Sequence, residues 1–476
     1  MTNKIQIYDD KNPVGYLNIF SETYLQFYYD EKWLIDSHSF AIDPELPLTN
    51  QMYESNRLWG CFEDISPDRW GRLLQNRLAG RVLNSIQYML GVSDYYRAGS
   101  LRLKINDEFI AQTKEIPKLI HINKLMQSSL NVEKEEYLKS DLEYLIAPSS
   151  SLGGARIKAS VVDNDKLYIA KFPSINDEHS VILWEKTMLD LAHIAKIKTA
   201  HSKIIETPNH KKVLLIERFD RTLDNKRIPF MSAMTLLRAK ERENAEQKSY
   251  VDFALYLEDL DKQELFRRMV FNTLFGNTDD HLRNHALLFN RGAKKWNLSP
   301  AYDLNPNPLP YNKQYHALNF VDNINLPSLE LCLSLKQYFA VDEKLCEEIL
   351  EDCFIAASKY QEVALENGIK RAEIKYFKEN FEHTEINLLY KKHQEQSQLK
   401  QNTIFFKARE KLNKINKNLE NQRNKINQED CETSVYENQK NVNEISQDEN
   451  NSLNQNNENL ENSYNQNSNK KLNKRK

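Results

Sequence analysis

The chain has 476 residues and a formal net charge of −3 at pH 7, from 65 Lys and Arg against 68 Asp and Glu. This length predicts two or three domains, and the balanced charge argues against a nucleic-acid-binding surface spread over the whole chain. Five scattered cysteines without a Cys-x-x-Cys pair argue against a disulfide framework or a structural zinc site, and no signal-like start or apolar run of about 18 residues is present, so we expect a cytoplasmic protein with no membrane contact.

Residues 1–112 are predicted to form a small α/β subdomain. Alternating apolar segments favour strands at 5–9, 15–20, 24–30 and 100–106, and the segment 68–83 favours a helix. Residues 113–147 are charged and helix-prone, so we expect a helical connector to the next domain.

The remaining chain is predicted to hold a strand-rich part, a helical part and a tail. Strand patterns at 158–163, 166–172 and 212–219, with a helix at 184–197, mark residues 148–228 as one lobe. Residues 229–392 favour helices, with one strand pair at 285–290 and 294–300. Residues 393–476 are rich in Asn, Gln, Lys and Glu and predict a disordered tail, because they bury too little apolar surface to offset the entropy of ordering. The fold class is therefore predicted to be α+β.

The strongest chemical signal is a polar run that follows a predicted helix ending near Gly276. Within it, Asp279 and Asn284 have the D-x-x-x-x-N spacing of a kinase catalytic loop, where the Asp orients the attacking hydroxyl and the Asn holds Mg²⁺. His281, in the same run, is a further candidate for cofactor binding. Asp and Asn also gather in ordinary turns, so this motif alone is a weak signal.

A second signal is the only adjacent glycine pair of the chain, Gly153 and Gly154, just before a predicted strand. Glycines let backbone N–H groups approach phosphate oxygens, and Arg156 or Lys158 could add positive charge. The segment is neither a Walker A motif nor G-x-G-x-x-G. Taken alone, an ordinary glycine turn between domains explains it equally well.

A lysine, a glutamate and a hinge segment follow in order. Lys171 lies on a strand with alternating apolar positions, as does the kinase lysine that binds α- and β-phosphates, and Glu185 on the next helix could pair with it. The strand leading to Glu217, Arg218 and Phe219 suits a hinge whose backbone meets adenine. Lys171 alone is more simply a solvated lysine at a strand end, and Glu185 alone a solvated residue on a helix face.

Asp303 completes the series, after a short strand pair, at the place where a kinase carries a second Mg²⁺-binding Asp. An Asp in a Pro-rich loop is the ordinary explanation. The order of glycine loop, Lys, Glu, hinge, D-x-x-x-x-N and Asp is nevertheless the order that a two-lobed kinase requires. The joint arrangement is much less expected by chance than any single motif.

At these residues the sequence resembles the HipA family of serine/threonine kinases. The similar segments are SLGGARIKA, YIAKFP, WEKTMLDLA, LLIERFDR, MSAMTLL, GNTDDHLRNHALL and LSPAYDLNP, together with DISPDRWGRLL and LGVSDYYRAGSLRL in the N-terminal part. The resemblance covers about residues 10–380 and implies a two-lobed kinase-like core with ATP between the lobes. The tail has no counterpart in it.

The resemblance also implies roles for single residues. It assigns catalysis to Asp279, Mg²⁺ to Asn284 and Asp303, the ATP phosphates to Lys171, and the adenine hinge to Glu217 and Phe219. Ser151 falls where family members autophosphorylate their glycine loop, which would add negative charge and switch the kinase off; Ser149 and Ser150 are neighbouring acceptors. Ile157 departs from the Pro or Glu of many relatives. Family members pair with a small helix-turn-helix antitoxin that carries the DNA contact, and their protein substrates include glutamyl-tRNA synthetase.

Three other readings stay open at this point. The chain could be an inactive ATP-binding partner in a DNA-bound repressor complex, or a kinase of small molecules. A metal-dependent hydrolase would use Asp279, Asp280, His281 and His285, but it would leave Lys171 and the glycine loop unexplained.

Overall fold

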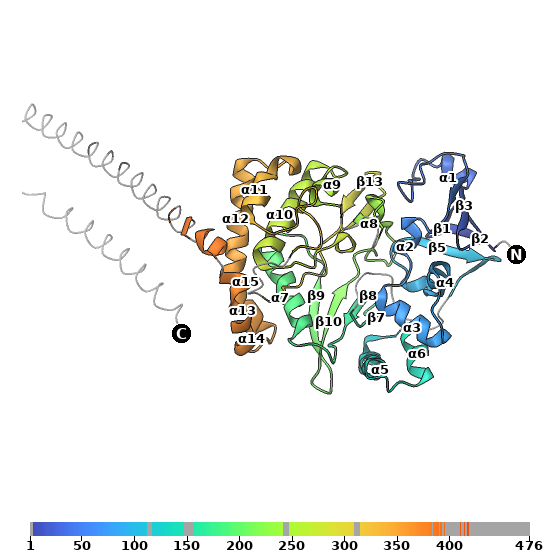
Figure 1. Cartoon of the computed structure of the whole chain (residues 1–476), viewed down its shortest axis with the longest axis horizontal. Helices are drawn as coiled ribbons and strands as arrows, with labels where there is room; N and C mark the ends of the chain where they lie inside the picture. The colour runs from blue at the N-terminus through green and yellow to red at the C-terminus, as the bar shows by residue number, and fades with distance from the viewer. Residues whose placement is uncertain are drawn as a thin grey trace, which may run out of the picture. The chain divides into compact units, whose positions relative to one another are not determined.

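The computed structural model describes residues 3–111, 117–146, 156–240, 247–308, 315–382 and 384–389, with a few single positions up to Lys417. The chain divides into one unit of Met1–His393 and a second of Gln394–Lys476. The helices and strands from β1 (Asn3–Asp9) to α15 (Lys378–Glu382) all belong to the first unit (Figure 1). The tail predicted from residue 393 lies almost wholly outside the described residues, and so does the glycine loop.

The N-terminal part is built on a six-stranded antiparallel sheet in the order β4-β3-β2-β1-β5-β6. Its strands are β1 (Asn3–Asp9), β2 (Asn12–Ser21), β3 (Tyr24–Tyr29), β4 (Tyr53–Ser55), β5 (Leu101–Ile105) and β6 (Glu108–Phe109). Alternate residues such as Ile5 and Ile7 are fully buried, as expected for a sheet with one face on a core. The four strands predicted here are confirmed.

Short helices pack on this sheet and lead out of it. They are α1 (Glu31–Ile35), α2 (Gly60–Asp64), α3 (Arg69–Ala79) and α4 (Ser85–Gly91). The carboxylate of Asp68 caps α3 by accepting a bond from the Gly71 N–H at 2.8 Å. Gly80 then ends the helix in the left-handed region at φ 66°, so α3 is shorter than the predicted 68–83 helix.

The central sheet has four antiparallel strands in the order β7-β8-β10-β9. They are β7 (Lys158–Asp163), β8 (Lys166–Lys171), β9 (Ser202–Glu206) and β10 (Lys212–Glu217). Helices α5 (Ile122–Glu133), α6 (Lys139–Ile146) and α3 bury one face of this sheet in a shared core. Strand β9 was not predicted, because its half-buried residues lack an alternating pattern.

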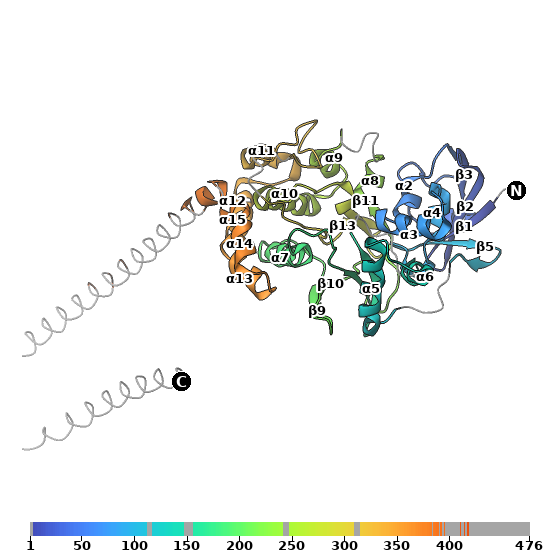
Figure 2. The same cartoon turned by 60° about the horizontal axis from the view of Figure 1, so that its bottom comes forward.

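Helix α7 (Val181–Ile194) lies between the central sheet and the C-terminal helices, where both Figure 1 and Figure 2 place it. Its Trp184 stacks on Phe381 at a centroid distance of 5.8 Å and packs on Phe377 at 4.3 Å. Helix α7 therefore shares its core with the C-terminal helices.

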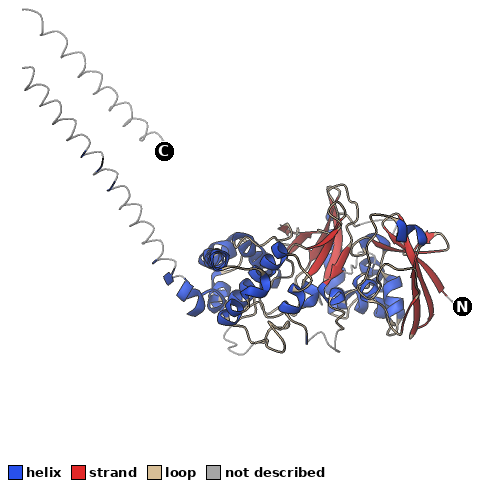
Figure 3. Ribbon diagram, turned by 90° about the horizontal axis from the view of Figure 1, so that it is seen from above, coloured by secondary structure: helices blue, strands red, loops and turns tan. Residues whose placement is uncertain are grey.

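The C-terminal part is helical, with one small sheet β11-β12-β13. Its strands are β11 (Phe230–Ser232), β12 (Ala286–Asn290) and β13 (Lys295–Leu298), and its helices are α8 (Ala233–Leu236), α9 (Tyr250–Ala254), α10 (Asp259–Phe275), α11 (Leu329–Ser334), α12 (Glu343–Ser358), α13 (Tyr360–Glu366), α14 (Arg371–Tyr376) and α15 (Lys378–Glu382). Strands gather in the N-terminal and central parts and helices in the C-terminal part (Figure 3). The predicted α+β class is confirmed. In the described part of the chain, no helix has the length and apolar character needed to cross a membrane.

Candidate functional site

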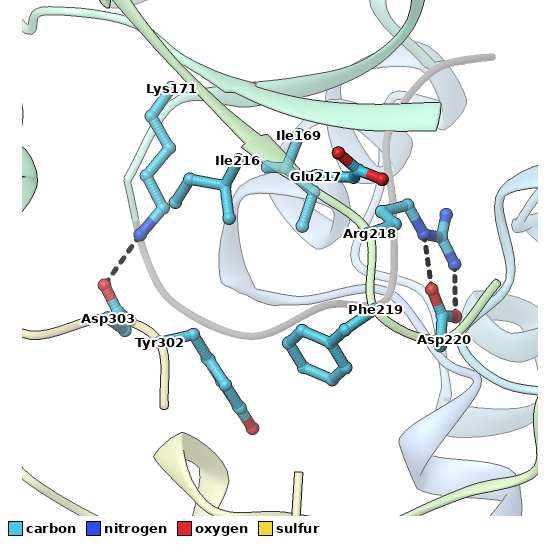
Figure 4. A pocket seen from close by; sticks show the side chains of 9 residues that line it. All are labelled: Ile169, Lys171, Ile216, Glu217, Arg218, Phe219, Asp220, Tyr302 and Asp303. Carbon is cyan, nitrogen blue, oxygen red and sulfur yellow. Dashed lines mark hydrogen bonds and ion pairs between the residues drawn. The ribbon is translucent and has the colours of Figure 1, made fainter. Parts of the chain in front are cut away.

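A pocket opens between the central sheet and the loops of the C-terminal part (Figure 4). Its lining consists of Ile169, Lys171, Ile216, Glu217, Arg218, Phe219, Asp220, Tyr302 and Asp303. In Figure 4 the two isoleucines lie on one side and the rings of Phe219 and Tyr302, 5.3 Å apart between centroids, lie on the other. An apolar slot thus ends at the charged pair of Lys171 and Asp303.

Strand geometry explains why these side chains share the pocket. On β8 the side chains of Ile169 and Lys171 are two residues apart and point to the same face, while Ala170 and Phe172 join the core on the other face. Ile216 of β10 lies directly opposite Ile169 in the antiparallel register. The alternating pattern of β8 therefore supplies both an apolar wall and a cation.

Lys171 is held by two carboxylates. Its Nζ lies 2.7 Å from Glu185 Oε1 on α7 and 2.7 Å from Asp303 Oδ1. Burial opposes the charged form of Lys171, but the negative charges of Asp303 and Glu185 outweigh it and raise the pKa of the ammonium. Lys171 is therefore a fixed cation at the end of the pocket, and the predicted Lys171–Glu185 pair is present.

Asp303 has an unusual backbone conformation, with φ at 59° in the left-handed region. A non-glycine residue there costs of order 1–3 kcal/mol and persists only where its surroundings fix it, which is common at functional sites. Burial favours the neutral acid, but Lys171 and then Lys158 favour the carboxylate, and together they lower the pKa of Asp303. Next to it, Asn305 Nδ2 donates to Asp303 Oδ1 at 3.3 Å.

The loop after α10 carries Asp279 and Asn284. Helix α10 ends where Gly276 adopts φ 70°, as the sequence predicted. The side chain of Asp279 reaches solvent, and Asn284 Nδ2 donates to the Asp279 carbonyl at 3.2 Å. Partial burial and the charges of Asp303 and Asp280 raise the pKa of the Asp279 carboxyl, although His281 opposes them. The charge of Asp303 acts on the Asp279 carboxyl, which places the two carboxylates near each other.

The neighbouring Asp280 is a buried anchor of this loop. Its carboxylate bonds His285 Nε2 at 2.8 Å, accepts from Asn272 Nδ2 at 3.0 Å, and accepts a short bond from the Tyr250 hydroxyl. Both Asp280 and His285 are almost fully buried. Their side chains hold the loop in place, which removes two of the ligands that the hydrolase reading needs. Among the described residues, no three His, Cys, Asp or Glu side chains form a metal-binding group.

The hinge is tied to the N-terminal subdomain. Arg218 donates to both carboxylate oxygens of Asp220, at 2.9 and 2.7 Å, and to the carbonyls of Tyr96 and Arg97. The Gly99 N–H donates to Asp220 at 2.7 Å. Burial alone would raise the pKa of Asp220, but the charges of Arg218 and Arg221 hold it well below its usual range. These bonds fix the backbone that runs along the pocket.

Comparisons with known proteins agree with this arrangement. The sequence matches the HipA N-terminal domain over residues 5–89 and the HipA-like C-terminal domain over residues 150–360, together more than half of the chain. The chain belongs to the HipA family. No curated protein shows significant similarity to it.

A solved HipA structure shares the fold. The chain is similar to a chain of the Shewanella oneidensis MR-1 toxin–antitoxin complex of HipA, HipB and operator DNA, with 15% identity, a TM-score of 0.57, and coverage of 79% of this chain and 94% of that one. It also matches the Helicobacter pylori proinflammatory kinase CtkA, with 16% identity, a TM-score of 0.39, and coverage of 50% and 95%. The HipA family match and the HipA structure confirm the predicted HipA-like fold class.

The sequence-predicted residues of this HipA-family chain fall into three groups. Lys171, Glu217, Arg218, Phe219 and Asp303 line one pocket. Asp279, His281 and Asn284 belong to the adjoining loop, and Glu185 supports Lys171 from α7. Ser149, Ser150, Ser151, Gly153 and Gly154 lie outside the described residues.

Two predicted residues near the glycine loop make ion pairs. Lys158 lies 3.0 Å from Asp68, and Arg156 lies 2.8 Å from Asp177. The side chain of Glu217 likewise bonds Lys166 at 2.9 Å, which leaves its backbone as the group that borders the pocket.

Sequence reasoning missed the apolar walls of the pocket. Ile169 could have been found, because it lies two residues from Lys171 and so points to the same face of β8. Ile216 lies directly opposite Ile169 on β10 and therefore faces the same pocket. Tyr302, directly before Asp303, gave no separate signal. Asp220 was also missed, since one of its partners, the Gly99 N–H, lies more than a hundred residues earlier in the chain.

Proposed function

We propose that this protein is an ATP- and Mg²⁺-dependent serine/threonine protein kinase of the HipA type. The observation that carries the proposal is the ammonium of Lys171, bonded to both Glu185 and Asp303 at the end of an apolar pocket. Protein kinases use this Lys–Glu pair and this Asp to hold the phosphates and their cation.

The pocket suits a nucleotide from end to end. An adenine ring is flat and apolar on its faces, so it fits between the isoleucines and the rings of Phe219 and Tyr302. The backbone of the hinge after β10 borders that slot and can exchange hydrogen bonds with the ring edge. The phosphates would then extend towards Lys171.

The residues near Asp303 fit a magnesium ion. Mg²⁺ prefers oxygen ligands and usually takes one or two carboxylates together with substrate phosphates. Asp303 offers a carboxylate and Asn284 an amide oxygen. Asn305 is half-buried, and its Oδ1 is a buried atom with no hydrogen-bond partner among the described residues. When bound, Mg²⁺ would neutralise phosphate charge.

Asp279 is the residue that we propose faces the acceptor hydroxyl. Its carboxylate reaches solvent beside Asp303, and its raised pKa makes it a better proton acceptor than an ordinary aspartate. Positioning and charge neutralisation would supply most of the rate enhancement. We further propose Ser151 of the glycine loop as a site of autophosphorylation that switches the kinase off.

The family likeness suggests the partners. The Shewanella relative was solved with HipB and operator DNA. By that likeness we propose that this chain acts in the cytoplasm, pairs with a small helix-turn-helix antitoxin, meets DNA only through that partner, and phosphorylates a protein such as an aminoacyl-tRNA synthetase.

Mass spectrometry tests the proposal. The full chain is incubated with Mg-ATP beside Asp279→Asn, and Asp259→Asn, an exposed carboxylate of α10, serves as the matched control. We expect one added phosphate on Ser149, Ser150 or Ser151 in the wild type and the control, and none in Asp279→Asn. Transfer only to a free metabolite would indicate a small-molecule kinase. Nucleotide binding without transfer to itself or to any protein offered would indicate an inactive partner.

A further inference from the structure

A buried ion pair joins the N-terminal subdomain to the edge strand of the central sheet. Lys158 Nζ of β7 lies 3.0 Å from Asp68 Oδ2, and the two side chains are only 2% and 4% exposed. The other oxygen of Asp68 accepts from the Gly71 N–H and caps α3. Asp68 is thus fixed by its helix while it faces a cation of the neighbouring lobe.

Helix α3 is itself immobilised on the central sheet. Trp70 and Leu74 belong to the core that also contains Ala170 and Phe172 of the β8 region. Closely packed cores are hardly compressible, so the elements that share one keep fixed positions relative to each other. The carboxylate of Asp68 therefore has a defined place relative to β7 and β8.

Lys158 lies directly opposite Lys171 in the antiparallel register of β7 and β8. Residues that are directly opposite share a sheet face, with Cβ atoms about 5 Å apart, and like charges in such a pair repel. Lys171 is neutralised by Glu185 and Asp303, and Lys158 by Asp68. Two lysine–carboxylate systems are thus held by neighbouring strands, with their lysines directly opposite each other.

The register of the strands brings the charge of Lys158 close to the site. Lys158 lies directly opposite Lys171, whose ammonium bonds Asp303 at 2.7 Å. Lys158 also begins the strand that follows the glycine loop, where nucleotide phosphates would pass. A second cation at this place suits a triphosphate, which carries more negative charge than one lysine can offset.

We propose that Asp68 is a positioning residue that holds Lys158 for the nucleotide phosphates, so that the N-terminal subdomain completes the ATP site. The inference rests on the proposed function, because it concerns the same nucleotide. Asp68 touches no substrate; it acts through Lys158. Loss of the Asp68 charge would release the Lys158 ammonium from its place on β7, opposite Lys171.

Asp68→Asn is the variant that isolates this role. Asn is as good a helix N-cap as Asp, so α3 keeps its cap and only the charge is lost. Dissociation constants of Mg-ATP and of adenosine are measured by calorimetric titration on the full chain. We expect ATP to bind about tenfold more weakly and adenosine to bind unchanged, because a charged contact of about 1.4 kcal/mol is tenfold in affinity and adenosine has no phosphate.

Controls separate this role from a structural one. Asp163→Asn removes a comparable carboxylate that pairs with Lys203 at 2.9 Å at the far end of the same strand, and it should leave both affinities unchanged. Lys158→Met should reproduce the ATP-selective loss. Adding Asp68→Asn to Lys158→Met should then weaken ATP no further, since the two residues act as one unit.

Each outcome decides a separate claim. Equal weakening of ATP and adenosine in Asp68→Asn, or no weakening of either, would overturn the positioning role while the kinase proposal stands. A wild-type chain that binds neither ligand would contradict the proposed function itself. If Asp68→Asn does not fold, normal ATP binding by Lys158→Met overturns the inference.

Discussion

Replacing Glu185 with Gln tests the ion pair at the centre of the proposed kinase site. Glu185 is 1% exposed, and its Oε1 lies 2.7 Å from Lys171 Nζ. Gln has the same shape and keeps an acceptor oxygen, but it carries no charge. Lys171 would still be held by Asp303 at 2.7 Å, so the cation would remain in the pocket while losing its anchor to α7.

The size of the effect follows from that second partner. Breaking a buried pair outright costs about 3–5 kcal/mol, because a charge is left alone. Here Asp303 remains, so the loss is nearer that of one charged hydrogen bond, about 2 kcal/mol. If the pair holds the phosphates in the transition state, kcat/KM for ATP should fall roughly 30-fold.

Initial rates of phosphate transfer at varied Mg-ATP give this ratio, and thermal unfolding shows whether the fold is kept. Asp190→Asn is the matched control, because Asp190 pairs with Lys186 on the same helix and lies outside the pocket lining. A Glu185→Gln enzyme whose kcat/KM stays within about threefold of wild type would refute the reasoning, since 2 kcal/mol predicts a far larger loss.

Three further perturbations have defined outcomes. The pKa of the Asp279 carboxyl is raised, so on acidification kcat should fall at a higher pH than it would for an ordinary aspartate. The fall in the pH–rate profile should correspond to the uptake of one proton. A kcat that does not change with pH would contradict the role of Asp279 as a base. Burial lowers the pKa of His316 from 6.5 to about 4. Between these two pH values the unfolded chain binds a proton at His316 and the native chain does not, so the free energy of unfolding falls by about 3 kcal/mol as the pH is lowered through this range. Urea unfolding of wild type and His316→Phe at pH 7 and 4.5 measures this effect. The fall in the free energy of unfolding between the two pH values should be smaller in His316→Phe, and an equal fall would contradict the role of His316. Gly276→Ala should lower the melting temperature more than Gly80→Ala, because both have positive φ but only at Gly276 would a Cβ come within 2.5 Å of Asn380 Nδ2; equal shifts would argue against the clash.

Much of the secondary structure around the site could be predicted from the local pattern of apolar residues in the sequence. The alternation of β8 placed Lys171 on a strand, and the helical spacing up to Gly276 placed the Asp279 loop at the end of α10. These features need only neighbours in sequence, since side-chain direction follows from the period of a strand or helix. The expected Lys171–Glu185 contact spans a strand and the next helix, and it too is present.

Contacts between distant segments could not be predicted from pattern. The Asp68–Lys158 pair joins residues that lie in different predicted domains, and Asp220 is bonded to Gly99 across the hinge. Nothing in the local sequence specifies such partners, because they depend on how whole elements pack. The same limit explains the missed strand β9, whose pairing with β10 and not its own pattern makes it a strand.

The packing of α7 bears on how such a kinase would be controlled. Glu373 of α14 accepts bonds from the Ser180 N–H at 2.7 Å, the Ser180 hydroxyl at 3.0 Å and the Trp184 indole at 2.9 Å, which ties the start of α7 to the C-terminal helices. Glu185 follows directly on that anchored turn. The helix that carries the Lys171 partner is therefore held by the C-terminal core. A switch that worked by moving α7 would have to break this core. Control at the glycine loop, as proposed through Ser151, would need no such rearrangement, because it would change charge next to the phosphates while leaving the pair assembled.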